Sequence, residues 1–208
     1  DVEWQRLWKD GCFEWVPLES VPAHTNIIST RFVYKKKPDI YKARTVARGF
    51  LQDLSETGDV HSPVARPQTV RTVLAWSAAQ GRSVLQGDVE GAYTKAPIDG
   101  PPIYVSAPSR DHTKPGHCIQ LHRCLYGLRS SGKGWYLTLC KYLRSQGLTP
   151  SASDPCLFTN ASKSLVVVFY VDDILVSSPD RAQADRFLSN MNSMHTSGSP
   201  WKVRNLGQ

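Results

Sequence analysis

Three aspartates, Asp88, Asp172 and Asp173, stand where apolar, strand-like segments end. Asp172 and Asp173 interrupt the apolar run 165–176, and Asp88 closes a shorter apolar stretch. The tip of a tight hairpin usually carries Asn-Gly or Asp-Gly, which reach positive φ at little cost, whereas Asp173 is followed by Ile174. When the adjacent acids are considered alone, a turn that merely separates two strands explains them equally well.

Convergence of the three acids would indicate a metal site. If the strands that carry Asp88 and the Asp172–Asp173 pair are neighbours in one sheet, the carboxylates meet. Two carboxylates about 4 Å apart repel by about 4 kcal/mol at an effective dielectric of about 20, and a divalent cation would offset this repulsion. Ligands that are all oxygen select Mg²⁺ or Mn²⁺. Two such ions, about 3.5 to 4 Å apart, are the arrangement used for nucleotidyl transfer.

The surrounding sequence predicts alternating strands and helices. A basic block from Arg31 to Arg48 reads as a hairpin with a cationic face and a turn at Pro38 and Asp39, for which a solvated edge hairpin is the simpler explanation. Helices are expected at 68–80, at 134–146 and after Ser178, which we take as the N-cap of the last. Strands are expected at 31–35, 43–48, 83–92, 103–105, 118–121, 156–158, 165–171 and 174–176.

Composition limits the class of protein and its partners. The 208 residues carry 25 Lys and Arg against 18 Asp and Glu, a net charge of +7, and 40% are hydrophobic. This is ordinary globular usage with a preference for polyanions. No stretch reaches the roughly 18 apolar residues of a membrane span, so no membrane partner is expected. Five cysteines, none two residues apart, argue against a disulfide framework and favour a reducing interior compartment. The six histidines show no paired metal spacing.

Six motifs in order resemble the reverse transcriptase of copia-type long-terminal-repeat retrotransposons. They run through nearly the whole chain: Tyr41-Lys42-Ala43-Arg44-Thr45-Val46-Ala47-Arg48-Gly49-Phe50; Ser62-Pro63-Val64; Asp88-Val89-Glu90-Gly91-Ala92-Tyr93; Leu125-Tyr126-Gly127-Leu128 with Trp135 downstream; Asp154-Pro155-Cys156-Leu157-Phe158; and Tyr170-Val171-Asp172-Asp173. Two features depart from the family pattern: a short turn at 35–40, and Lys133-Gly134 in place of a proline-plus-basic pattern.

The resemblance implies a role for each matching residue. Asp88, Asp172 and Asp173 would be the catalytic triad and the ligands of two Mg²⁺ or Mn²⁺ ions, with the carbonyl of Val89 completing one shell. Tyr93 would lie under the incoming sugar and exclude ribonucleotides; otherwise it is a core aromatic.

The remaining matches would bind substrate. Arg44 and Lys42 would hold the triphosphate, or else are solvated surface cations. Gly127 would let backbone approach the templating base pair, or else is an ordinary turn glycine. Trp135 is interpreted as core packing without a chemical role.

The implied fold class is α+β: a right-hand polymerase palm, an antiparallel sheet backed by helices, with a basic mixed α/β fingers subdomain and no thumb. The expected bounds are 1–66 and 97–130 for the fingers and 67–96 and 131–208 for the palm. The segment 201–208 resembles the start of the last palm hairpin.

The expected function is RNA-directed DNA polymerase, with an RNA template, a DNA primer and dNTP as partners. Thumb, ribonuclease H and integrase domains of a polyprotein, or a larger complex, would be further partners. One alternative is a captured remnant that acts as a non-catalytic nucleic-acid-binding or scaffold subunit. Another two-metal palm enzyme, such as a nucleotide cyclase, explains the acids but not the basic block. The expected location is intracellular, in a cytoplasmic particle or the nucleus, with an organelle left open.

Overall fold

The structure is a computed structural model that describes residues 2–38, 40–53, 57–196 and 199–206. The chain divides into two compact units, Asp1–His61 with Tyr93–Gly134, and Ser62–Ala92 with Trp135–Gln208. Helices and mostly antiparallel sheets occur together, so the α+β class is confirmed. Within the described ranges, no helix is long and apolar enough to cross a membrane.

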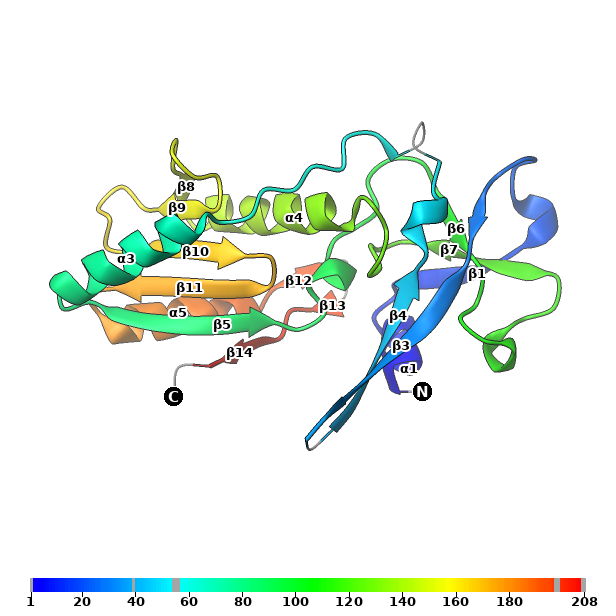
Figure 1. The fold of residues 1–208 in the computed structure, drawn as a ribbon, viewed down its shortest axis with the longest axis horizontal. Coiled ribbons are helices and arrows are strands. Elements are labelled where there is room, and N and C mark those ends of the chain that lie inside the picture. Colours follow the sequence, from blue (N-terminus) through cyan, green and yellow to red (C-terminus); the bar gives the residue numbers. More distant parts are fainter. Residues whose placement is uncertain (1, 39, 54–56, 197–198, 207–208) are drawn as a thin grey trace. The chain divides into compact units, whose positions relative to one another are not determined.

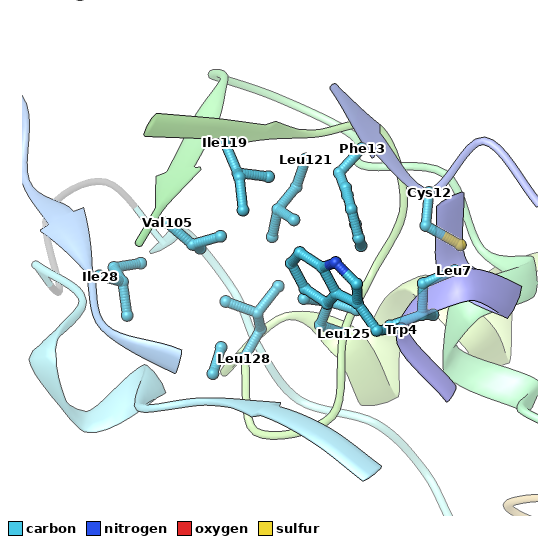
Figure 2. Packing of buried hydrophobic residues seen from close by; sticks show 11 residues of the cluster. Trp4, Leu7, Cys12, Phe13, Ile28, Val105, Ile119, Leu121, Leu125 and Leu128 are labelled. Carbon is cyan, nitrogen blue, oxygen red and sulfur yellow. The ribbon is translucent and has the colours of Figure 1, made fainter. Parts of the chain in front are cut away.

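The first unit contains a four-stranded sheet of order β1-β7-β6-β2. Its strands are β1 (Phe13–Pro17), β2 (Ile27–Ile28), β6 (Ile103–Val105) and β7 (His117–Leu121). Helix α1 (Val2–Lys9), which the sequence pattern did not indicate, contributes Trp4 and Leu7 to the core of this unit. In Figure 2 the Trp4 indole lies among side chains from β1, β7 and the loop that carries Leu125 and Leu128.

The predicted basic hairpin of the first unit is confirmed. Strands β3 (Thr30–Lys37) and β4 (Ile40–Ala47) pair antiparallel along their whole length. The register places Val33 opposite Arg44 and Lys35 opposite Lys42, so Arg44 and Lys42 share one face of the hairpin. Pro38 is described, while Asp39 of the predicted turn lies outside the described residues.

The second unit is built on a six-stranded antiparallel sheet of order β14-β5-β11-β10-β9-β8 (Figure 1). The strands are β5 (Ser83–Val89), β8 (Thr149–Pro150), β9 (Leu157–Thr159), β10 (Val166–Tyr170), β11 (Asp173–Ser178) and β14 (Val203–Asn205). The short strands β12 (His195–Thr196) and β13 (Ser199–Pro200) form a separate pair. Strand β5 is shorter than predicted, and Gly91 just beyond it has a φ of 63°, which is incompatible with an extended strand.

Three helices pack on this sheet. Helix α5 (Arg181–Asn192) covers one face, where Leu188 lies against Gly87. Helix α3 (Pro67–Ala79) packs on the opposite face, where Ser77 hydrogen-bonds Ser177 at 2.7 Å. Helix α4 (Ser131–Ser145) brings Tyr136 against Phe169 of β10, with ring centroids 5.9 Å apart.

The N-cap of α5 is Asp180, so our assignment of Ser178 was wrong. The Asp180 carboxylate accepts the Ala182 N–H at 2.9 Å. Ser178 is the last residue of β11; its hydroxyl accepts the Asp180 N–H and donates to the Gln183 side chain. The serine therefore shapes the entry to the helix from the end of the strand, and the aspartate fills the capping position.

A buried carboxylate ties α3 to the loop before β9. Asp154 accepts the backbone N–H of Arg66 at 3.0 Å and that of Cys156 at 2.9 Å, and Thr69 donates its hydroxyl to it. Burial raises the pKa of Asp154, but these hydrogen bonds outweigh it, so the pKa lies below its usual value. Asp154 thus satisfies donors at the start of α3, whose first turn contains no acid of its own.

Candidate active site

Asp88 and Asp173 lie directly opposite each other on neighbouring antiparallel strands, β5 and β11. The same register sets Gln86 opposite Leu175, so these residues share one face of the sheet with the two acids. Side chains that face each other in this way have Cβ atoms about 4.5 to 5.5 Å apart. The condition set from the sequence, that the strands carrying Asp88 and the Asp172–Asp173 pair are neighbours, is therefore met in the second unit.

Asp172 stands beside this pair in the turn that joins β10 to β11. Tyr170 pairs with Asp173, which leaves Val171 and Asp172 as the two residues of the turn. Val89 donates its N–H to the Asp172 carbonyl at 3.0 Å, which fastens the turn to the end of the Asp88 strand. Val89 itself is buried and faces Val203 of β14.

The turn contains an unusual backbone conformation. Val171 has a φ of 57°, in the left-handed region, where a β-branched residue is a genuine outlier. Such strain costs roughly 1–3 kcal/mol and persists only where the surrounding structure enforces it. The carbonyl of Val171 accepts the indole N–H of the buried Trp135 at 2.6 Å.

Arg204 is the closest charged partner of Asp88. The register of β14 sets Arg204 opposite Asp88, and both its Nε and Nη2 donate to Oδ2 of Asp88, the former at 3.2 Å. Its Nε also lies 3.3 Å from a Glu90 oxygen. The guanidinium therefore pairs with two carboxylates at the end of β5, and sequence reasoning missed it because only the β14 register brings it there.

The donor chemistry of the three aspartates fits a hard divalent cation. Carboxylate oxygens are the ligands that Mg²⁺ and Mn²⁺ prefer. In the part of the chain that the structure describes, however, no group of three or more His, Cys, Asp or Glu side chains is gathered tightly enough to hold a metal. Arg204 engages Oδ2 of Asp88 instead, and Gln86 donates to Oδ1 of Asp173 at 3.3 Å.

A hollow of about 240 Å³ opens next to Asp173 on the same face of the sheet. Its lining is mainly apolar and includes Val70 of α3, Val168 and Tyr170 of β10, and Leu175. Asp173 is exposed beside the hollow, so a ligand bound there would meet both an apolar floor and a carboxylate.

Two of the predicted substrate residues of the first unit, Arg44 and Tyr93, both contact the Tyr126 ring. The Arg44 guanidinium lies 4.9 Å from the centroid of the Tyr126 ring. The Tyr126 ring also packs edge to face against the Tyr93 ring, with ring centroids 5.1 Å apart. Tyr126 thus contacts both Arg44, the residue predicted to hold the triphosphate, and Tyr93, the residue predicted to lie under the sugar. Lys42 lies further along the hairpin and is exposed.

Gly127 has a packing requirement of its own. It has a φ of 88°, and a Cβ added there would lie 2.1 Å from the Ala47 carbonyl oxygen. Ala47 in turn donates its N–H to the Tyr126 carbonyl at 2.8 Å. Close approach of this loop to the end of β4 therefore demands glycine at position 127.

The predicted site residues are divided between the two units. Asp88, Val89, Asp172 and Asp173 meet in the second unit. The first unit holds Arg44, Lys42, Tyr93 and Gly127. Three contributors were missed from the sequence: Arg204, Tyr126 and the hydrogen bond of Trp135. Of these, only Tyr126 could have been found from the sequence, since it lies within the Leu125–Leu128 motif.

Comparison with known sequences agrees with this arrangement of motifs. The sequence profile of the family described as reverse transcriptase (RNA-dependent DNA polymerase) matches residues 14–198. The chain belongs to the reverse transcriptase family. This domain is also 32% identical over 195 residues to the retrovirus-related Pol polyprotein from transposon RE1 of Arabidopsis thaliana.

Two further relatives match similar shares of this chain, against 87% for the transposon RE1 polyprotein. The Pol polyprotein from transposon TNT 1-94 of Nicotiana tabacum is 28% identical over 86% of this chain, and the truncated transposon Ty1-A Gag-Pol polyprotein of Saccharomyces cerevisiae is 29% identical over 88% of it. These relatives are Pol polyproteins of copia-type retrotransposons, as the motifs predicted. The reverse transcriptase domain spans only 13% to 15% of the length of these three relatives.

Proposed function

We propose that this reverse transcriptase domain is the core of an RNA-directed DNA polymerase that adds dNTPs to a DNA primer on an RNA template. The observation that carries the proposal is the cross-strand pairing of Asp88 with Asp173, with Asp172 in the adjoining turn. In this proposal the second unit is the palm and the first unit is the fingers.

Asp88, Asp172 and Asp173 would hold two Mg²⁺ or Mn²⁺ ions, with the Val89 carbonyl as a further oxygen ligand. The ions, when bound, activate the primer hydroxyl and stabilise the charge that develops on the transferred phosphate and the leaving pyrophosphate. The Arg204 guanidinium must break its hydrogen bonds to Oδ2 of Asp88 before that oxygen can bind a metal ion. The chain itself supplies the acids and the rigid sheet that fixes their spacing.

The first unit would bind the nucleotide. Arg44 pairs with triphosphate oxygens, a task that suits the planar fork of a guanidinium, and Lys42 adds a second positive charge. Tyr126 restrains Arg44 through the face of its ring. Tyr93 packs under the deoxyribose and excludes a 2′-hydroxyl, and Gly127 admits the backbone to the templating pair.

The remaining partners follow from the relatives, which are long polyproteins. A thumb, a ribonuclease H domain and an integrase, or a larger complex, would act with this domain, and the site of action would be an intracellular particle, the nucleus or an organelle. The net charge of +7 supports binding of template and primer.

The test is primer extension by the 208-residue chain on a primed RNA template with Mg²⁺ or Mn²⁺. Asp172→Asn should abolish dNTP addition and leave primer-template binding, measured by fluorescence anisotropy, unchanged. Extension by this variant at the wild-type rate would refute the proposal.

The ion pair between Arg204 and Asp88 favours a second candidate function, because it satisfies a candidate metal ligand without a metal. In that case the domain is a captured remnant that acts as a nucleic-acid-binding or scaffold subunit. A thermal shift with Mg²⁺ and dNTP separates the two: a shift that Asp88→Asn abolishes supports the polymerase, and no shift in either protein supports the scaffold.

A further inference from the structure

The peptide group that precedes Asp172 is held by a buried tryptophan. Trp135, near the start of α4, is 1% exposed, and its indole N–H donates to the Val171 carbonyl at 2.6 Å. That carbonyl belongs to the peptide group that joins Val171 to Asp172. The hydrogen bond therefore fixes the plane of the peptide that enters the candidate metal ligand.

The peptide group that follows Asp172 is held as well. The Asp172 carbonyl accepts the Val89 N–H at 3.0 Å. The backbone on both sides of Asp172 is thus fastened, once by a side chain of α4 and once by the strand that carries Asp88. With both peptide planes set, the direction of the Asp172 Cα–Cβ bond is set too, and the backbone limits the rotamers that the carboxylate can adopt.

The conformation of Val171 explains why such a restraint is needed. A non-glycine, β-branched residue at a φ of 57° favours escape to an ordinary conformation unless its surroundings hold it. Any relaxation of Val171 rotates the following peptide and carries Asp172 away from Asp88 and Asp173. A donor aimed at the Val171 carbonyl opposes that rotation.

The hydrogen bond is distinct from the packing role of the same side chain. The Trp135 ring contacts Trp201, with centroids 5.1 Å apart, and Trp201 contacts Tyr142 at 5.4 Å. A phenylalanine at position 135 would keep an aromatic ring beside Trp201 but would lose the N–H. Only the indole N–H, which is a donor and never an acceptor, adds the bond to the turn.

We propose that Trp135 is a positioning residue for Asp172, which it acts on through the carbonyl of Val171. The inference rests on the proposed function, because it assumes that Asp172 binds metal. It predicts that loss of the indole N–H weakens metal binding and slows nucleotide transfer, while substitution of the neighbouring indole, Trp201, affects only stability.

The experiment compares Trp135→Phe with Trp201→Phe in the full chain. Mn²⁺ affinity is measured by isothermal titration calorimetry, the stability by urea unfolding, and kcat and KM for dNTP by primer extension. For Trp135→Phe we expect Mn²⁺ affinity to fall about three- to tenfold, the size of one hydrogen bond, and kcat to fall roughly tenfold or more with KM nearly unchanged. Trp201→Phe should leave Mn²⁺ affinity and kcat unchanged.

A second substitution tests the mechanism. Val171→Gly in the Trp135→Phe background should restore most of the Mn²⁺ affinity, because glycine adopts positive φ without strain. Should Trp135→Phe fail to fold, Trp135→benzothienylalanine keeps the size of the ring, lacks the N–H and should show the same loss of affinity.

Equal Mn²⁺ affinity and kcat in wild type and in the variant without the N–H, or equal losses in Trp135→Phe and Trp201→Phe, would overturn the inference. These outcomes differ from a failure of the proposed function. If the polymerase proposal is wrong, either wild type shows no primer extension or Asp172→Asn extends the primer at the wild-type rate, whatever Trp135 does. If only the positioning role is wrong, wild type is active, Asp172→Asn is inactive and Trp135→Phe matches wild type.

Discussion

Arg204 faces Asp88 across β14 and β5 and donates to its Oδ2 from two nitrogens, so a cation from the protein already occupies the place where a metal ion would approach. The arginine is 55% exposed in its side chain and also reaches Glu90. It is therefore free to swing into solvent, and its ion pair competes with a metal at Asp88 instead of blocking the site permanently.

Arg204→Gln should raise the affinity for Mn²⁺ about 1.5- to 5-fold, because a solvent-exposed ion pair is worth about 0.2–1 kcal/mol. Isothermal titration calorimetry measures the Mn²⁺ affinity of both proteins. The difference in affinity between Arg204→Gln and wild type should become smaller at high salt, which screens the ion pair. Arg186→Gln removes the same charge from an exposed pair with Asp180 and should leave the affinity unchanged. A lower affinity in Arg204→Gln would mean that Arg204 holds Asp88 in its metal-binding position.

Tyr126→Ala should raise the KM for dNTP about two- to fivefold with little change in kcat. The substitution removes the ring that Arg44 lies over, a half-buried contact worth about 0.5–1 kcal/mol. Tyr126→Phe keeps the ring and should retain the wild-type KM in steady-state primer extension. Tyr41→Ala is the matched control, because Tyr41 also lies under a cation, Lys36, but at the exposed end of the hairpin. A KM unchanged in Tyr126→Ala would remove Tyr126 from nucleotide binding.

Asp154→Asn should lower the free energy of unfolding by about 1.5–3 kcal/mol near neutral pH, since hydrogen bonds to a buried charged group are lost. The pKa of Asp154 lies below its ordinary value of about 3.9. Its stabilising contribution is therefore complete above about pH 4 and is lost as the pH falls through the folded-state pKa.

Urea unfolding between pH 2 and pH 7 measures this dependence. The difference in the free energy of unfolding between wild type and Asp154→Asn should become smaller as the pH falls below about 4. Asp111→Asn, at an exposed position, should show no such difference. A gap between wild type and Asp154→Asn that stays constant down to pH 2 would show that the ionised carboxylate is not the stabilising form.

The local elements of the fold could be predicted because their signals are local. The apolar run 165–176 and the stretch before Asp88 have strand composition, and the three strands predicted there are present as β10, β11 and β5. The Gln68–Gln80 periodicity, with Pro67 before it, predicted α3 nearly to its ends. The eight-residue helix α1 was missed because so short a segment carries little periodicity.

The parts of the candidate site that were not predicted from the sequence depend on strand register and on nonlocal contacts. Nothing in the local sequence indicates that Arg204 pairs with Asp88, since a shift of one residue in β14 would turn it to the other face. Trp135 was assigned to the core, which is confirmed by its burial, but its N–H bond to Val171 depends on how α4 packs against the sheet. Tyr126 contacts Arg44 only because the Tyr126 loop pairs with the end of β4.

The most direct test of the central claim is a calorimetric titration of Mn²⁺ into wild type, Asp88→Asn and, as a control, Asp111→Asn. The account predicts saturable binding to wild type and to Asp111→Asn, and at least about a tenfold loss of affinity in Asp88→Asn, which removes one charged ligand. Equal Mn²⁺ affinity in all three proteins would contradict the claim that Asp88, Asp172 and Asp173 form one metal site.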